Sequence, residues 1–279
     1  MVLSGAMFNF EKLNRNITSV NKVPLIAEIM PTKWAYEALM VRQFKNNRFN
    51  SNFFELDREI SSANFKSAYL IPELQERIEV LYDTYEDGGE LKEHMARFEV
   101  LKNEILREQD NITGYSFAAE DFTPEMFGGK FAATVNDFLD DLNDFYLQRY
   151  TKTNKKKHKY LDELMEEKRE TYFRLLNQYH NESVADQVKK IYEKNPIVES
   201  EGRLYQQKNP IYLYPESTRS HFYAPVKMLG GKYFDTYWFN ISFIWFLTII
   251  LYGVLYFDLV HKLIDAPLFK KKIRHRLRA

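Results

Sequence analysis

The chain has 279 residues, of which 45% are hydrophobic and 28% are charged, and its formal net charge at pH 7 is zero. This composition is that of a folded protein and excludes an intrinsically disordered chain. The absence of cysteine excludes disulfides, thiolate catalysis and zinc sites built from cysteine. A basic C-terminal tail offsets an acidic remainder, so we expect no nucleic acid as a partner.

Residues 1–50 predict the end of a preceding membrane segment and an interfacial or re-entrant helix. The first eight residues (MVLSGAMF) are apolar, but they are too short to span a membrane and lack the basic start of a signal peptide. A connection near a membrane surface is expected next. A helix is then predicted to begin at Pro31, because apolar side chains such as Trp34, Ala38 and Leu39 recur at helical spacing.

Residues 51–195 predict an antiparallel bundle of amphipathic helices. Apolar side chains step by three and four residues through each segment, with charged side chains between them. Breaks are expected at Gly88–Gly89, in the loop at 110–129 and in a lysine-rich turn over 151–159. The predicted helices cover 54–69, 72–87, 90–109, 130–150 and 160–180, and a short helix follows with Ser183 and Asp186 as its N-cap pair.

The pattern of residues in the last part of the chain predicts an extended connector followed by a transmembrane helix. Prolines and short β-type runs dominate residues 196–235 and exclude long helices there. The stretch from Thr236 to Phe257 has no charged residue, and as a helix it would be about 33 Å long, enough to cross a hydrocarbon core of about 30 Å. We therefore predict a transmembrane helix over residues 236–258. A buried helix of a soluble protein is the alternative, but such helices usually carry a polar stripe.

Charges on either side of this helix predict its orientation. Seven lysines and arginines lie in residues 259–279, whereas the matching stretch before the helix offers Arg219, Lys227 and Lys232. The positive-inside rule therefore places the C-terminus in the cytosol and the bulk of the chain outside. We expect a protein of the cell (inner) membrane with an extracytoplasmic bundle, a basic cytosolic tail and membrane lipids as partners. Export of so large a region requires an earlier span, which we expect upstream of Met1.

Motifs for catalysis and nucleotide binding are absent from the sequence. There is no G-x-S-x-G and no G-x-x-x-x-G-K-[ST], and the histidines lack zinc-binding spacing. We therefore expect that the chain is not an enzyme and holds no cofactor. Four aspartates recur at a spacing that places their carboxylates on one helix face. They could form a divalent-cation site or a solvated face. We favour the solvated face, because hard cations usually draw ligands from loops or from several elements. The four aspartates are Asp137, Asp140, Asp141 and Asp144.

Two stretches resemble a known family of transporters. Residues 3–7 (LSGAM) and 31–39 (PTKWAYEAL) are similar to the end of the fifth transmembrane segment and the external re-entrant helix of G-subfamily-like ABC exporters. Residues 220–240, which include SHFYAP and DTYWFN, resemble the approach to the last transmembrane helix in bacterial members that fuse an ATPase to the permease. Family members carry several more spans and a nucleotide-binding domain, whereas this chain has one complete span.

The resemblance implies that the chain is the C-terminal part of the permease region of such an exporter. It would contribute the last transmembrane helix and a large external loop domain to ATP-driven transport. The implied partners are the remaining transporter spans and an ATP-binding domain, with a dimer in the full transporter. Candidate gate or interfacial residues are Trp34, Tyr36, Leu39, Tyr237 and Trp238. The alternative is a self-sufficient membrane-anchored helical domain that binds a partner outside the cell membrane.

Overall fold

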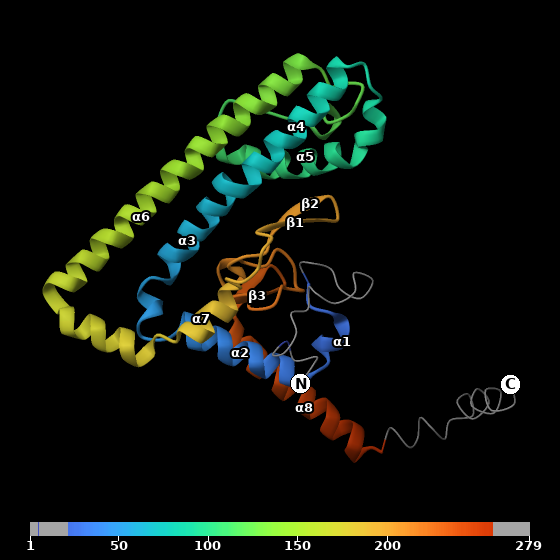
Figure 1. Cartoon of the computed structure of the whole chain (residues 1–279). Helices are drawn as coiled ribbons and strands as arrows, with labels where there is room; N and C mark the ends of the chain where they lie inside the picture. The colour runs from blue at the N-terminus through green and yellow to red at the C-terminus, as the bar shows by residue number, and fades with distance from the viewer. Residues whose placement is uncertain (1–4, 6–21, 259–279) are drawn as a thin grey trace, which may run out of the picture.

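The structure is a computed structural model that describes Gly5 and residues 22–258. It confirms a mainly helical fold with an apolar helix near the C-terminus. A long bundle occupies one side of the molecule, a smaller part with two β-hairpins lies beside its lower end, and the apolar helix projects away from both (Figure 1).

The helices, in chain order, are α1 (Leu25–Glu28), α2 (Pro31–Lys45), α3 (Phe54–Phe65), α4 (Ile71–Glu86), α5 (Met95–Glu108), α6 (Gly129–Tyr179), α7 (Glu182–Lys189) and α8 (Thr236–Tyr256). Two antiparallel hairpins pair β1 (Ile197–Ser200) with β2 (Arg203–Gln206), and β3 (Val226–Leu229) with β4 (Lys232–Asp235). Single 3-10 turns occur at Asn50–Asn52, Leu91–His94, Gln109–Asn111, Ala119–Asp121 and Pro210–Tyr212. The extended connector predicted over residues 196–235 therefore begins and ends with a hairpin, and residues 207–225 lie between the two.

The helices α3 and α4 form one continuous rod instead of the two separate helices expected (Figure 1). A π-helical segment, Lys66–Leu70, joins them and ends two residues before Pro72. A proline obstructs the hydrogen bond to the preceding turn, and the wider π turn relieves that obstruction. Pro72 therefore leaves the direction of the rod unbroken and changes only its hydrogen-bond register.

The lysine-rich turn expected over residues 151–159 is wrong. α6 runs without interruption through these residues, and its non-helical backbone lies instead at Lys168, where φ is −139° and ψ is 38°. The run contains neither glycine nor proline, and lysine is a good helix former. Contacts to α3 also hold this part of the helix, since Lys157 forms an ion pair with Asp57. Charge density alone is therefore no helix breaker.

Two apolar clusters make up the core. The first joins the end of α3, α4, α5 and the N-terminal half of α6, and Leu204 of β2 packs into it. The second joins α2 and α7 with Ile211, Phe222 and Tyr223. Among the described residues, none from α8 belongs to either cluster. Residues 51–195 thus contribute to both cores rather than to one bundle alone.

The N-cap of α7 also differs from the expectation. Asn181, not Ser183, caps this helix, and its side-chain oxygen accepts a hydrogen bond from the Val184 amide at 3.1 Å. Asparagine caps a helix as well as serine does, so the sequence offered two caps two residues apart. The choice of Asn181 leads α7 directly from the end of α6 onto α2.

Candidate functional site

The helix α2 packs along the first turns of α8 in the opposite direction. The ring centroids of Trp34 and Phe243 lie 4.3 Å apart, near the start of α2. At the other end of α2, Lys45 forms an ion pair of 2.9 Å with Asp235, directly before α8 begins. Arg42 lies between these contacts, with its guanidinium 4.3 Å from the ring centroid of Tyr237. The order of these contacts makes the two helices antiparallel.

A carboxylate without solvent exposure occupies the centre of this packing. Glu37 of α2 accepts hydrogen bonds from Lys227 of β3 at 2.6 Å, from Asn240 of α8 at 3.1 Å and from the Tyr223 amide at 3.2 Å. Lys33, one turn earlier on α2, lies 3.3 Å from the same carboxylate. One side chain therefore joins α2, the β3–β4 hairpin and α8.

The charges in this network are balanced. Lys33, also without solvent exposure, lies 3.2 Å from Glu28 as well as near Glu37, so two carboxylates face two ammonium groups. Lys227 also donates to the hydroxyl of Ser220 at 2.6 Å. Burying an isolated charge is costly, whereas a buried charge that is paired and hydrogen-bonded persists.

The pKa values follow from this arrangement. Burial by itself would raise the pKa of Glu37, but the charges of Lys227 and Lys33 outweigh it and lower that pKa to about 2. Burial lowers the pKa of Lys227 to about 8, against the pull of Glu37. Both groups therefore carry their charges at neutral pH. Nearby, burial lowers the pKa of His221 to about 4, so its ring is neutral there.

The α2–α8 contact brings together most of the candidate gate or interfacial residues. Trp34 is buried against α8, and Tyr237 and Trp238 lie at the head of α8 within reach of Arg42. Tyr36 points elsewhere, since its ring packs against Phe222 and Tyr223 in the second cluster. Leu39 is 64% exposed.

α8 carries the strongest indication of a membrane. Among the described residues it is the one helix long and apolar enough to cross one, and only 6% of its apolar window is buried. Comparisons with protein-family models, curated proteins and solved structures found no match. The resemblance of residues 31–39 and 220–240 therefore remains a comparison of short motifs. Residues 3–4, 6–7 and the basic tail lie outside the described residues, as do any contacts they make.

Sequence reasoning missed the polar residues of the α2–α8 contact. Lys33 and Glu37 lie four residues apart on a helix whose apolar pattern predicts a buried face. Opposite charges at this spacing could have indicated an ion pair within the helix. Asn240 is a polar residue one turn into an otherwise apolar span, and such residues usually have a partner. Lys227 gave no signal, because nothing near it in the sequence distinguishes a paired lysine from a solvated one.

The acidic helix face is exposed, as the solvated interpretation expects. Asp140 accepts from the side chain of Gln75 at 2.8 Å and Asp141 from the hydroxyl of Tyr115 at 2.7 Å. These two bonds tie α6 to its neighbours. In the part of the chain that the structure describes, no group of three or more histidine, aspartate or glutamate side chains is placed to hold a metal ion.

Proposed function

We propose that the chain is the C-terminal part of the membrane region of an ABC exporter, contributing its last transmembrane helix and a large external domain to ATP-driven transport. Its partners are then the remaining spans, an ATP-binding domain and membrane lipids, in a dimeric transporter. In this proposal the C-terminus is cytosolic and the bundle lies outside the cell (inner) membrane.

The antiparallel packing of α2 on α8 is the observation that carries this proposal. Phe243 lies seven residues after Thr236, so its partner Trp34 lies roughly 10 Å along α8 from the head of the helix. The corner between α1 and α2 therefore descends beside the apolar helix, and it exposes Leu25, Ile26 and Ile29. A short helix that enters the membrane beside a span is what the resemblance implies for residues 31–39.

The buried charges support a role in coupling. Breaking a buried ion pair by removing one partner typically costs about 3 to 5 kcal/mol, so the pair of Glu37 and Lys227 resists separation. Because Lys227 belongs to the β3–β4 hairpin and Asn240 to α8, the external part and the head of the span move together in this proposal. A displacement of α8 would then be transmitted to the external domain.

The reading frame upstream of Met1 tests the proposal. We expect it to continue in frame through further apolar spans and a Walker A motif. A stop codon shortly before Met1, with no transporter gene beside it, would contradict the proposal.

The orientation can be tested separately, since the chain contains no cysteine. We expect a cysteine at Lys152, which is exposed on α6, to react with an impermeant thiol reagent in cells stripped of any outer barrier. A cysteine at Ala279 should react only after the membrane is permeabilised. The opposite pattern would contradict a cytosolic C-terminus.

One observation favours the alternative of a self-sufficient anchored domain. The first apolar cluster draws on residues 63–146 and Leu204, and α8 adds nothing to it. A chain that ends before Thr236 tests whether the external part is complete on its own. Cooperative unfolding of a soluble helical monomer would favour the alternative. Because the truncation also uncovers Trp34, the result that would favour missing permease spans is a helical product without a cooperative transition, not aggregation alone.

A further inference from the structure

A cavity of about 220 Å³ lies between the bundle and the connector that returns to α8. Its walls come from α3 and the π-helical segment, from the end of α5, from β2 and from residues 212–221. π turns inside helices occur frequently at functional sites, and here the first residue of the π segment, Lys66, lines the cavity. Nothing in the transport proposal uses this cavity.

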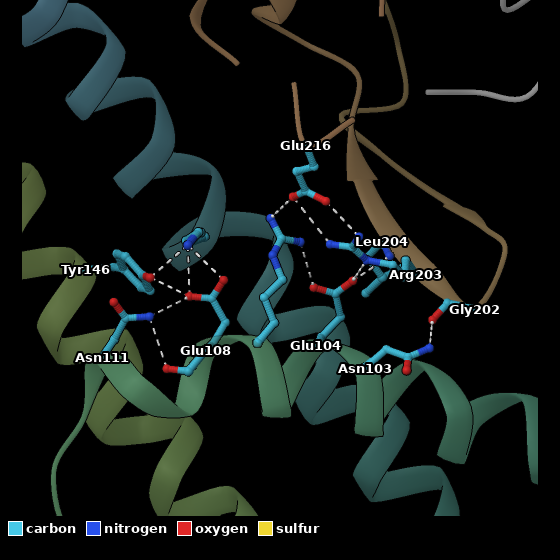
Figure 2. Close-up of polar contacts among 11 residues, drawn as sticks. Asn103, Glu104, Glu108, Asn111, Tyr146, Gly202, Arg203, Leu204 and Glu216 are labelled. Carbon is cyan, nitrogen blue, oxygen red and sulfur yellow. Dashed lines mark hydrogen bonds and ion pairs between the residues drawn. The ribbon is translucent and has the colours of Figure 1, made fainter. Parts of the chain in front are cut away.

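A buried carboxylate fixes one wall. Glu108 of α5 is 2% exposed and accepts two hydrogen bonds of 2.8 Å from the ammonium of Lys66. The hydroxyl of Tyr146 also donates to Glu108, and Asn111 donates at 3.2 Å (Figure 2). Burial and the neighbouring carboxylate raise the pKa of Tyr146, which keeps its hydroxyl protonated. Lys66 is thus fully engaged, and its charge is compensated by Glu108.

A second set of charges closes the adjacent wall. Arg107 donates to Glu104 at 3.4 Å and lies 2.8 Å from Glu216 (Figure 2). Arg203 of β2 reaches Glu216 at 2.8 Å as well, and the Leu204 amide donates to Glu104 at 2.9 Å. Burial would raise the pKa of Glu216, but the hydrogen bond from Arg203 and the charges of Arg107 and Arg203 outweigh it and lower that pKa. Glu216 and Glu104 together therefore pair with these two arginines.

Two arginines of the lining remain outside these sets. The Arg58 guanidinium lies over the ring of Tyr214, 4.6 Å from its centroid, and donates to Glu55, which does not line the cavity. Arg219 donates to the carbonyl oxygen of Val23 and has no carboxylate partner among the described residues. With the partners Glu55, Glu104 and Arg203 included, five cationic side chains stand against four carboxylates, so the cavity has one positive charge in excess.

We propose that this cavity binds a small organic anion, made of one six-membered ring that carries a phosphate or a carboxylate. Arginine guanidinium groups match both oxyanions in geometry, and Arg58 and Arg219 are the cations available to hold one. A cavity of 150 Å³ holds benzene, so about 220 Å³ accommodates a ring with one charged substituent. The ring would lie against the aromatic lining, which includes Tyr212 and Tyr214.

Titration calorimetry on the full chain in lipid nanodiscs tests this inference, with three probes. Glucose 6-phosphate carries a phosphate, glucuronate carries a carboxylate, and glucose is the uncharged control. We expect at least one of the two anions to bind once per chain while glucose gives no signal. The stronger anion then identifies which oxyanion the cavity prefers. Absence of binding by both anions at millimolar concentration overturns the inference.

Matched variants locate the site. A charge-assisted hydrogen bond lost from a binding site weakens affinity roughly tenfold or more, so we expect Arg58→Gln and Arg219→Gln each to have that effect. Lys155→Gln removes one positive charge from an exposed position on α6 and should leave affinity unchanged. Equal weakening by all three variants would show non-specific attraction and overturn the inference. Should Arg219→Gln not fold, Arg58→Gln decides alone.

Anion binding in this cavity does not depend on a role of the chain in transport. Binding is measured on the chain alone, with neither ATP nor other spans present. If neither anion binds, the transport proposal is unaffected, because the upstream reading frame tests it separately. If a stop codon precedes Met1, the anion proposal is unaffected, because the calorimetry tests it separately.

Discussion

Glu37→Gln is the sharpest perturbation of the α2–α8 contact. The substitution keeps the shape of the side chain but removes the negative charge that lies 2.6 Å from Lys227 and 3.3 Å from Lys33. Lys33 retains Glu28 as a partner, whereas Lys227 loses its carboxylate and remains buried. Breaking a buried pair in this way costs about 3 to 5 kcal/mol. A pKa of about 2 instead of 4.5 for Glu37 corresponds to about 3 kcal/mol, which agrees.

Denaturant unfolding of the full chain in detergent, followed by circular dichroism at several pH values, measures this loss. Because the folded-state pKa of Glu37 lies below its unfolded value, its stabilisation is complete above pH 4.5 and disappears as the pH falls towards 2. The difference in unfolding free energy between wild type and Glu37→Gln should therefore have its full value just above pH 4.5, where Lys227 keeps its charge. It should shrink steadily as the pH is lowered below that value.

Glu163→Gln is the matched control, because Glu163 is an exposed carboxylate whose partner Lys159 lies 3.8 Å away on the same helix. Exposed pairs contribute little, so we expect a change below about 0.5 kcal/mol. A loss below about 1 kcal/mol for Glu37→Gln, or a difference that does not depend on pH below 4.5, would refute the reasoning. Either result would mean that the network is open to water.

Three further predictions concern stability in the same assay. Burial lowers the pKa of His221 to about 4, so the unfolded chain takes up a proton at this residue before the folded chain does, and stability decreases as the pH falls from 6.5 to 4. His221→Gln can still donate to the Pro210 carbonyl and should remove that decrease. An unchanged dependence of stability on pH would contradict this role of His221. Trp34→Ala should cost about 3 to 5 kcal/mol, whereas Leu39→Ala at an exposed position should cost less than about 0.5 kcal/mol; equal losses would argue against α2 packing on α8 through Trp34. Lys155→Pro should cost about 3 kcal/mol or more inside a continuous α6, while tolerance would indicate the turn that the structure lacks.

Long periodic segments made most of the fold predictable from the sequence. The start of α2 at Pro31 and the start of α8 at Thr236 were both expected, because a helix-initiating proline and an abrupt loss of charge mark them. The errors came from local signals that the surrounding structure overrides. Pro72 is accommodated by a π turn, and the lysines of residues 151–159 continue a helix that α3 supports.

The candidate site was predictable only on its apolar side. Trp34 and Tyr237 stand out as aromatic residues at the edges of apolar segments, and the structure places both at the α2–α8 contact. The charged partners could not be paired from the sequence, because 190 residues separate Glu37 from Lys227. Lys227 even counted as a flanking charge for the orientation, although it is almost fully buried. Patterns within a window of sequence cannot identify such pairs.

The beginning of the α3–α4 rod and the end of α6 meet at the base of the bundle. The ring nitrogen Nδ1 of His180 lies 3.2 Å from the side-chain oxygen of Asn50, and the ring of Phe49 packs against that of His180. A second attachment lies further along the bundle, where Arg77 of α4 pairs with Glu199 of β1 at 2.8 Å and Leu204 of β2 packs into the first cluster. Removing whole turns between these two attachments would therefore displace the β1–β2 hairpin together with the bundle. The length of the bundle is thus coupled to the position of this hairpin.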